Sequence, residues 1–174
     1  MIIASTVAER PDLAERGVDS SRVWPEYNRH GDVVNRWWRY LWEELPDLQI
    51  LLYDDETGEV VAEGHTGVLA WDGQDESLPG SFDELIEVVI TTGRSGGPVN
   101  TLAALAAEIP PEGRRRGLAG EIMAAMRALA VSRGLTHLVA PVRPSWKDRY
   151  PLAPIESYVQ WRRDDGELLD PGCA

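Results

Sequence analysis

A glycine-containing turn flanked by arginines has the clearest chemical potential in the sequence. The stretch IPPEGRRRGLAG, Ile109 to Gly120, joins an apolar segment that ends at Pro110-Pro111 to a long helical pattern. Amides in the first turn of a helix have no intrahelical acceptor, and the helix dipole adds partial positive charge there. Such a turn can hold a pyrophosphate through backbone N–H groups. Gly117 would let the ligand approach the backbone closely, and Ala119 and Gly120 would keep side chains away from it.

Three consecutive arginines, Arg114, Arg115 and Arg116, lie in this turn. Guanidinium groups suit phosphate oxygens, and positive side chains beside a helix N-terminus are unfavourable without an anion. A solvated basic helix start is the alternative, but the arginine run favours a bound anion. The stretch lacks the lysine and hydroxyl residue of a Walker A loop and the glycine triplet of a dinucleotide fingerprint.

The turn lies inside a predicted strand–helix–strand unit. Val99–Ile109 is predicted to be a buried strand, although its alanines weaken the pattern. Gly117–Arg133 predicts a helix with one apolar face, and Gly134 is the expected C-terminal glycine. Thr136–Val142 predicts the next strand. Such a unit implies a parallel pair of strands joined by a right-handed crossover in a mixed sheet.

This arrangement resembles the acyl-coenzyme A signature of the GCN5-related N-acetyltransferase (GNAT) superfamily. The family pattern is Arg/Gln-x-x-Gly-x-Gly/Ala, and it is matched here by Arg114-Arg115-Arg116-Gly117-Leu118-Ala119. The resemblance covers Val99 to about Val142 well and the N-terminal half by element order. It implies an α/β (α+β) fold with a mixed, mostly antiparallel central sheet, helices on both faces and a splayed βαβ cofactor site.

The resemblance also implies the ligand and the type of reaction. Acetyl-CoA would be the co-substrate, with the backbone of Ala107, Glu108 and Ile109 along its pantetheine arm and the segment Arg114–Gly120 at its phosphates. The amide near Ile109 would polarise the thioester carbonyl. The acetyl group would pass directly to a small-molecule amine in a ternary complex. Cys173 has no histidine partner in the sequence, so it is not expected to be a nucleophile.

A tyrosine in or near the last helix is the acid that the resemblance implies for the leaving thiolate. Tyr150 and Tyr158 are the candidates, and Tyr158 is preferred because it lies in the predicted helix Pro154–Arg163. A packed tyrosine whose hydroxyl binds backbone is an equally good interpretation.

The base for the amine is open between Glu108, Glu63 and His65, either directly or through water. Nothing in the sequence chooses between them. Glu108 is the one that we name as a catalytic candidate beside Tyr158. Positioning of the reactants would then contribute more than the base.

A second basic cluster follows the predicted strand that ends at Val142. The pattern Pro-Val-Arg-Pro-Ser-x-Lys-x-x-Tyr-Pro resembles that of a poorly characterised bacterial subgroup of the superfamily. Arg143 or Lys147 could reach the adenosine phosphate, and a loop held by surface ion pairs is the alternative. Only turns are predicted after Trp161, so the last strands of the family are expected to be missing.

The N-terminal half supplies the other predicted elements. The strands are Ile2–Val7, Leu48–Tyr53 and Val60–Trp71, and the helices are Pro11–Arg16, Asp32–Leu45 and the segment that starts at Phe82. The last two strands form an antiparallel hairpin. Asp32 is the expected N-cap of its helix, whose tryptophans are interpreted as core-facing rather than as a substrate wall. The β-branched run Val88–Thr92 also fits a strand, and Gly93–Pro98 is predicted to be a loop.

Composition indicates one domain that spans residues 1–174. Hydrophobic residues make up 43% and charged residues 26% of the chain. No apolar segment has the length of a bilayer span, and the N-terminus lacks the pattern of a secretion signal. The chain has one cysteine and three scattered histidines, so no metal-ligand spacing occurs. These features predict a cytoplasmic protein without a structural metal.

A formal net charge of -12 argues against binding to nucleic acid or anionic membranes. The charge is compatible with a cationic amine as substrate, and a homodimer stays open. N-acetyl transfer is the preferred function. The alternatives are a non-catalytic acyl-CoA-binding module and a GNAT-like acyl-transfer or decarboxylation enzyme of a biosynthetic pathway.

Overall fold

The computed structural model describes residues 1–24, 26–114 and 116–171. The chain divides into two compact units, with the boundary between Ala140 and Pro141. The first unit holds one sheet and four helices, and the second holds the short helix α5, Ile155–Tyr158. In the described residues, no helix combines the length and the apolar character that crossing a membrane requires. That residues 1–174 act as one domain stays a prediction.

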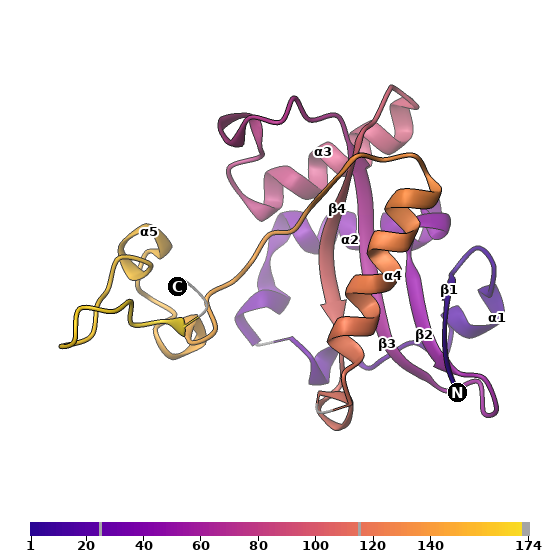
Figure 1. Cartoon of the computed structure of the whole chain (residues 1–174), viewed down its shortest axis with the longest axis horizontal. Coiled ribbons are helices and arrows are strands. Elements are labelled where there is room, and N and C mark those ends of the chain that lie inside the picture. Colours follow the sequence, from indigo (N-terminus) through magenta and orange to yellow (C-terminus); the bar gives the residue numbers. More distant parts are fainter. Residues whose placement is uncertain (25, 115, 172–174) are drawn as a thin grey trace. The chain divides into compact units, whose positions relative to one another are not determined.

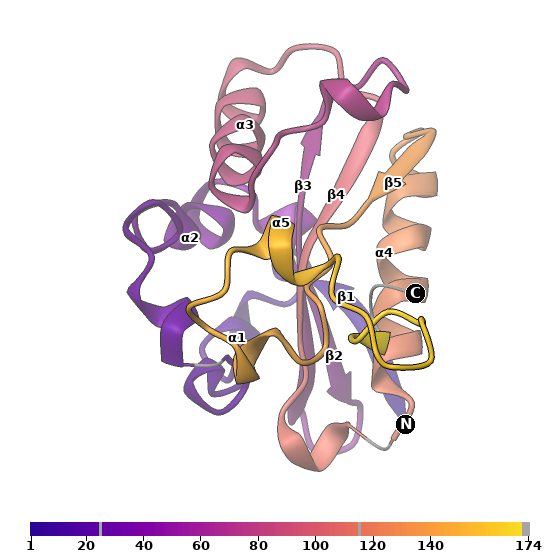
Figure 2. The ribbon, with the colours of Figure 1, turned by 90° about the vertical axis from the view of Figure 1, so that its left-hand side faces the viewer.

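The first unit is built on a five-stranded sheet whose strands follow one another in chain order. They are β1 (Ile2–Thr6), β2 (Ile50–Asp54), β3 (Val60–Leu69), β4 (Thr101–Glu108) and β5 (His137–Val139). Strands β1 to β4 pair antiparallel, and β4 pairs parallel with β5 (Figures 1 and 2). Helices cover the sheet on both faces, so the predicted mixed, mostly antiparallel fold is confirmed.

Helix α4 (Leu118–Ser132) covers one face of the sheet (Figure 1). Its buried residues Leu118, Ile122 and Met126 pack on apolar side chains of β2, β3 and β4. Gly64 of β3 permits this close packing, because a Cβ there would lie 2.9 Å from Met126 Cε. The predicted helix Gly117–Arg133 is therefore confirmed, with Gly117 as its N-cap.

Helices α2 (Asp32–Glu44) and α3 (Phe82–Ser95) cover the other face together with the short α1 (Pro11–Ala14). The tryptophan-rich side of α2 packs towards this core, as predicted. Helix α3 is a helix despite its β-branched run. The Ser81 hydroxyl accepts from Glu84 N–H at its start, and left-handed Gly96 ends it.

Four sequence predictions differ from the structure. The N-cap of α2 is Gly31, and Asp32 lies in the first turn, where a carboxylate favours the helix dipole. Helix α3 extends to Ser95, into the segment predicted as a loop, because Gly96 rather than Gly93 ends it.

The predicted strand Thr136–Val142 pairs only over His137–Val139, since prolines follow closely. The predicted helix Pro154–Arg163 is shortened to α5, after which an isolated bridge joins Arg162 to Leu168.

We expect Gly67→Ala to lower the free energy of unfolding by about 1–3 kcal/mol, as overpacking does in a filled core. A Cβ at Gly67 of β3 would overlap the side chain of Val89 in α3. Denaturant unfolding would measure the loss.

Gly97→Ala is the matched control, because Gly97 is exposed and a Cβ added there would lie 3.6 Å from its nearest neighbour, Ser95 Oγ. Adding Val89→Ala to Gly67→Ala should cost less than the two single losses together. Equal losses at Gly67 and Gly97 would contradict the packing argument.

Candidate functional site

The edge of β4 is open over its second half. Strands β4 and β5 pair only from Thr101 with His137 to Ala103 with Val139. Beyond Ala103, no strand in the described residues pairs with this edge (Figure 2). Ala107 lies in the open part and is exposed. An open edge offers backbone N–H and C=O groups to an extended ligand.

Strand β4 carries one more residue than the opposing part of β3. His65 pairs with Ala106 and Thr66 pairs with Ala104, so Leu105 has no partner on β3. This pattern is a β-bulge, which bends a strand and shifts the side chains that follow it.

The bulge decides which way the end of β4 faces. Ahead of it, Ala104 packs on the α4 side of the sheet. If side chains alternated without interruption along β4, Glu108 would point to the α4 side like Ala104. The extra residue reverses this alternation, so that Glu108 points to the other side. Glu108 pairs with Glu63 of β3, whose neighbour Gly64 faces α4. Glu63 and Glu108 therefore both face away from α4.

The turn that leads into α4 leaves its backbone accessible. Gly117 has a φ of 78°, a left-handed conformation that favours glycine. A Cβ at Gly117 or at Gly120 would meet no atom within 4 Å. Leu118 is buried and fixes the start of the helix, and Ala119 is exposed beside it.

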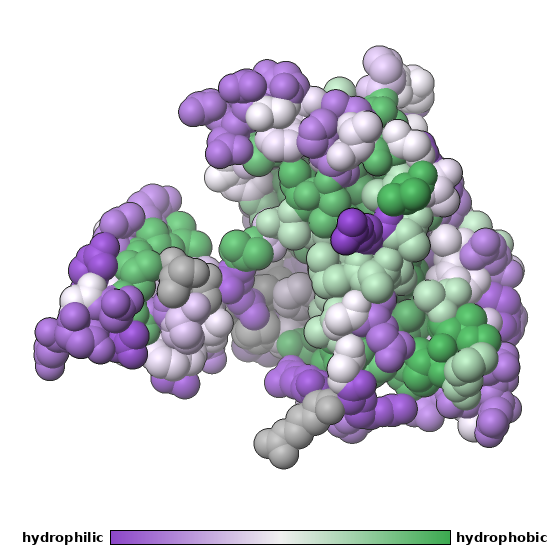
Figure 3. Space-filling view, viewed as in Figure 1, coloured by the Kyte–Doolittle hydropathy of each residue, from purple (hydrophilic) through white to green (hydrophobic). Residues whose placement is uncertain are grey.

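The charge of this turn is uncompensated within the described part of the chain. Arg114 and Arg116 are exposed, and neither forms an ion pair with another described residue. No side chain among the described residues caps the N-terminus of α4. Hydrophilic residues gather at this end of the α4 face, whereas the surface over α4 itself is more apolar (Figure 3). A helix N-terminus with adjacent guanidinium groups suits a phosphate ligand.

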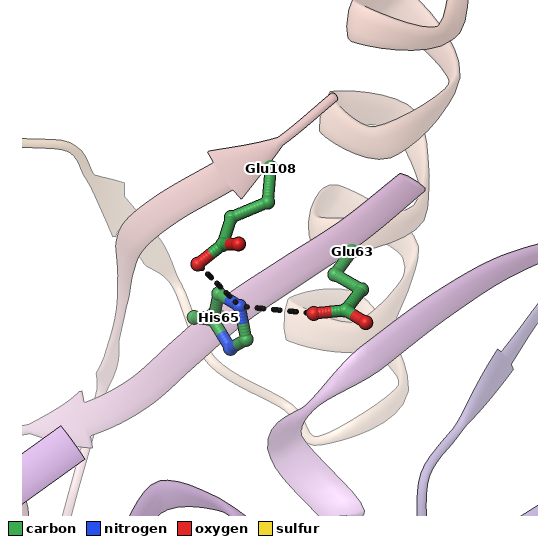
Figure 4. A group of neighbouring side chains, drawn as sticks. All are labelled: Glu63, His65 and Glu108. Atoms are coloured by element: carbon green, nitrogen blue, oxygen red, sulfur yellow. Dashed lines mark ion pairs between the residues drawn. The ribbon is translucent and has the colours of Figure 1, made fainter. Parts of the chain in front are cut away.

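A buried cluster of ionisable side chains lies on the opposite face of the sheet. Glu63, His65 and Glu108 are 4%, 1% and 1% exposed. Nε2 of His65 lies 3.3 Å from Oε1 of Glu108 and 3.5 Å from Oε2 of Glu63 (Figure 4). Both carboxylates thus converge on one nitrogen of one imidazole.

Each carboxylate has one further donor. The indole Nε1–H of Trp24 donates to Glu108 Oε1 at 2.8 Å, and the Val18 amide donates to Glu63 Oε1 at 2.7 Å. Oε2 of Glu108 is buried and has no hydrogen-bond partner among the described residues. That oxygen is an unused acceptor inside the protein, which is costly unless a ligand or water supplies a donor.

The surroundings of His65 favour its protonated form. Burial by itself lowers the pKa of His65, but Glu108 and Glu63 together outweigh burial and raise the pKa above its ordinary value. The rings of Trp38 and Trp42 on α2 lie 4.8 and 5.2 Å from the imidazole, centroid to centroid. Aromatic rings at this distance also stabilise a cation.

The same three residues have the donor types of a metal site, since their ligand atoms lie within 4.8 Å of one another. Metal-bound histidines usually donate their second ring N–H to an acceptor. Nδ1 of His65 has no such partner within the part of the chain that the structure describes. An imidazolium would leave the same Nδ1–H without an acceptor, so these contacts are compatible with both arrangements.

The structure brings most of the expected site residues to the end of β4 and the start of α4. Ala107 and Glu108 end β4, Ile109 follows, and the exposed turn precedes α4. Arg115 and Cys173 lie outside the described residues. Glu63 and His65, which the sequence left open as bases, lie beside Glu108 rather than apart from it.

Trp24 was not among the site residues predicted from the sequence. The structure places its indole N–H on Glu108, 84 positions along the chain. No local pattern signals such a contact. The one available signal is that Trp24 is a half-buried tryptophan outside the predicted core, and the indole N–H of such a residue usually has a hydrogen-bond acceptor.

Tyr158 lies in the second unit and is 1% exposed. Its hydroxyl donates to Oδ2 of Asp170 at 2.7 Å. Asp170 also accepts from the amides of Ser145 and Trp146. Tyr158 thus has the packed, hydrogen-bonded environment of the alternative interpretation, with a carboxylate instead of backbone as partner. Its role as the acid stays a prediction.

The second basic cluster is held by local contacts. Lys147 Nζ donates to the Tyr150 carbonyl at 2.9 Å, and the Arg149 guanidinium lies 4.6 Å from the ring centroid of Trp146. Arg143 has an interaction as well. A contact of Lys147 or Arg143 with a phosphate stays a prediction.

Comparison with known proteins gives one curated relative. No protein-family model matches the chain. The chain is similar to the arginine N-acetyltransferase avaD of Aspergillus versicolor, with 31% identity over 173 residues that cover 92% of this chain and 59% of that protein. The chain therefore spans about three fifths of the length of this relative.

Solved structures match over nearly the whole chain. The loading GNATL domain of CurA from Lyngbya majuscula has a TM-score of 0.62 and 18% identity, over 99% of this chain and 79% of that one. The GphF GNAT-like decarboxylase in complex with isobutyryl-CoA has a TM-score of 0.62 and 19% identity, over 98% of this chain and 80% of that one. These likenesses concern the fold.

We expect Trp24→Phe to lower the free energy of unfolding by about 1–3 kcal/mol, because it removes a donor from the buried carboxylate of Glu108. Denaturant unfolding at neutral pH would measure the loss.

Trp37→Phe is the control, since Trp37 makes the same type of bond to the exposed Glu87. Its loss should be below about 0.5 kcal/mol, as for most surface changes. A loss at Trp24 no larger than that at Trp37 would contradict the importance of the bond to Glu108.

Proposed function

The chain belongs to the GNAT superfamily, and on this premise we propose that it moves the acetyl group of acetyl-CoA onto the amine of a small molecule. The observation that carries the proposal is the conjunction of an open β4 edge with the exposed left-handed turn at Gly117. The open edge could bind an extended pantetheine arm, and the turn could bind a pyrophosphate.

The proposed cofactor site follows the chain from β4 into α4. The backbone of Ala107, Glu108 and Ile109 would bind the pantetheine arm. The amides of Gly117, Leu118 and Ala119 would bind the pyrophosphate, Gly120 would keep the space beside it open, and Arg114, Arg115 and Arg116 would attract the phosphates. Two of these arginines are exposed and make no ion pair with another described residue, which supports the assignment.

In the proposed reaction, the amine nitrogen attacks the thioester carbonyl in a ternary complex. Glu108 takes a proton from the amine, the N–C bond forms, and the C–S bond breaks to release the CoA thiolate. The Ile109 amide would stabilise the oxyanion, and Tyr158 would protonate the thiolate. The burial of Glu108 and its unpartnered Oε2 support its role as the base.

The acceptor that we propose is a small cationic amine. The net charge of -12 and the buried carboxylates favour a cation over a neutral or anionic acceptor. Arginine is the first acceptor to test, because the curated relative is named for arginine N-acetylation. Cytoplasmic action, a single domain over residues 1–174, and the absence of nucleic-acid and membrane partners belong to the same proposal.

Thiol release is the direct test of this function. The protein would be mixed with acetyl-CoA and a panel of amines that includes arginine, and free CoA thiol would be measured. We expect release above the hydrolysis background with at least one cationic amine, together with a product one acetyl group heavier. Binding of acetyl-CoA without release for any amine would favour a non-catalytic acyl-CoA-binding module. Conversion of malonyl-CoA to acetyl-CoA and CO₂, without an amine product, would favour a decarboxylase.

We expect acetyl-CoA to raise the melting temperature of the wild-type chain and Gly117→Asp to abolish this shift. A carboxylate at the helix N-terminus would repel the pyrophosphate. At a ligand concentration of 100 times Kd, the wild-type stabilisation should be about 2.7 kcal/mol.

Gly134→Asp is the matched control, because Gly134 also has a positive φ and open space around it but lies beyond the other end of α4. It should lose similar intrinsic stability and keep the acetyl-CoA shift. A folded Gly117→Asp variant with an unchanged shift would remove this turn from the cofactor site.

A further inference from the structure

The buried cluster on β3 and β4 has an unbalanced charge. Two carboxylates, Glu63 and Glu108, would leave two negative charges inside the protein if His65 were neutral. Burying unpaired charges is strongly unfavourable. An imidazolium at His65 reduces the net charge of the cluster to one negative unit. Both carboxylates lie within ion-pair distance of Nε2, which favours a positive charge on the ring, while Nδ1 has no hydrogen-bond partner among the described residues.

We propose that His65 is a positioning residue, an imidazolium held between Glu63 and Glu108 that compensates the charge of Glu108 and leaves its Oε2 oxygen to accept an N–H of a cationic acceptor amine. This inference rests on the proposed acetyl transfer and assigns the parts of the cluster to different tasks. Glu108 is the base, His65 compensates its charge, and Glu63 anchors His65.

The hydrogen-bond pattern of Glu108 separates its two oxygens. Oε1 accepts from Trp24 and lies 3.3 Å from His65 Nε2. Oε2 has no partner among the described residues. A carboxylate oriented through one oxygen presents the other in a fixed direction. An ammonium N–H is a donor of matching charge for that oxygen.

Glu63 is held from the other side. Its Oε1 accepts from the Val18 amide at 2.7 Å, and its Oε2 lies 3.5 Å from His65 Nε2. The Glu63 carboxylate packs closely against Gly17, since a Cβ at Gly17 would overlap Glu63 Oε1. Glu63 is thus fixed by the chain around it and can serve as the permanent counter-ion of His65.

The proton balance of the transfer is consistent with this division. Before transfer, the cluster carries one net negative charge and the acceptor ammonium carries one positive charge. One ammonium proton moves to Oε2 of Glu108, and the freed lone pair forms the bond to the acetyl carbon. As the C–S bond breaks, the nitrogen loses a second proton, which balances the proton that the CoA thiolate takes up to become the thiol. The cluster is then neutral, because Glu108 is protonated while Glu63 and His65 stay paired. No metal or redox partner is needed.

The charged groups within ion-pair distance of His65 in the described residues are Glu63 on β3 and Glu108 on β4. Helix α2 contributes the uncharged rings of Trp38 and Trp42. Removing the imidazolium would therefore leave Glu108 facing only the like charge of Glu63, which makes the negative base form less favourable. Because Glu108 acts in its ionised form, the acidic limb of the rate profile would then move to higher pH.

The first experiment compares the pH dependence of kcat/KM for the wild type, His65→Gln and Glu63→Gln. We expect His65→Gln to move the acidic limb upward by about one pH unit or more and to lose roughly tenfold or more at pH 7. Much of that loss should be recovered above pH 8. Glu63→Gln removes a negative charge, so it should not move the limb upward. An equal loss at every pH in His65→Gln would indicate a merely structural role and overturn the proposal.

The second experiment needs no activity and no variant of the cluster. ¹⁵N-histidine labelling and NMR of the wild type should show one imidazole that keeps both ring nitrogens protonated at a pH where an ordinary histidine has lost its proton. His30→Gln and His137→Gln, both at exposed positions, would identify the other two signals. A neutral His65 at pH 7 would overturn the proposal even if His65→Gln fails to fold.

The outcomes separate this inference from the proposed function. Thiol release by a wild type whose His65 is neutral would leave the function standing and remove the charge-compensation role. No thiol release with any amine would remove the function, and the proposed role of His65 in it, even if NMR shows an imidazolium. Stoichiometric Zn²⁺ binding that His65→Gln abolishes would make the cluster a metal site and overturn the proposal.

Discussion

Two carboxylates buried in the sheet require a compensating charge, and much of the first unit is arranged around this requirement. His65 lies between them, and the indole of Trp24 and the amide of Val18 supply donors from segments far away in the chain. Helix α2 closes the cluster with aromatic rings rather than with further charges. Burial strengthens each of these contacts, because the effective dielectric constant is lower than in water. The same burial makes any missing partner costly.

The open edge and the buried cluster meet at consecutive residues. Ala107 lies on the open edge of β4, while the side chain of Glu108 reaches the cluster on the face opposite α4. The end of β4 therefore presents its backbone to the proposed pantetheine arm and the side chain of Glu108 to the proposed acceptor amine. No hinge or second element is needed to bring the two proposed binding surfaces together. The parting of β4 from β5 and the bulge at Leu105 together produce this arrangement.

The sequence predicted what depends on local pattern and missed what depends on register. Gly117 and the helix that follows it could be predicted because turn chemistry and helical periodicity are read over a few residues. The shared face of Glu63 and His65 follows from their spacing in one strand. The orientation of Glu108 depends on a bulge that no periodicity of β4 announces. The Trp24 contact spans 84 positions, and nothing local encodes it. Helix α3 was ambiguous from its β-branched run, and its caps at Ser81 and Gly96 support the helix.

The bulge has a consequence in genetic terms. Loss of a single codon at Leu105 would keep both glutamates and the histidine in the protein and leave β4 almost as apolar as before. With even alternation restored, the carboxylate of Glu108 would point to the α4 side of the sheet, where the apolar side chains of Ile122 and Met126 pack close to Gly64. The composition of the site would survive while its arrangement would not. The position of the base is thus specified by the length of a strand as well as by the identity of a residue, and comparisons of composition alone would not detect its loss.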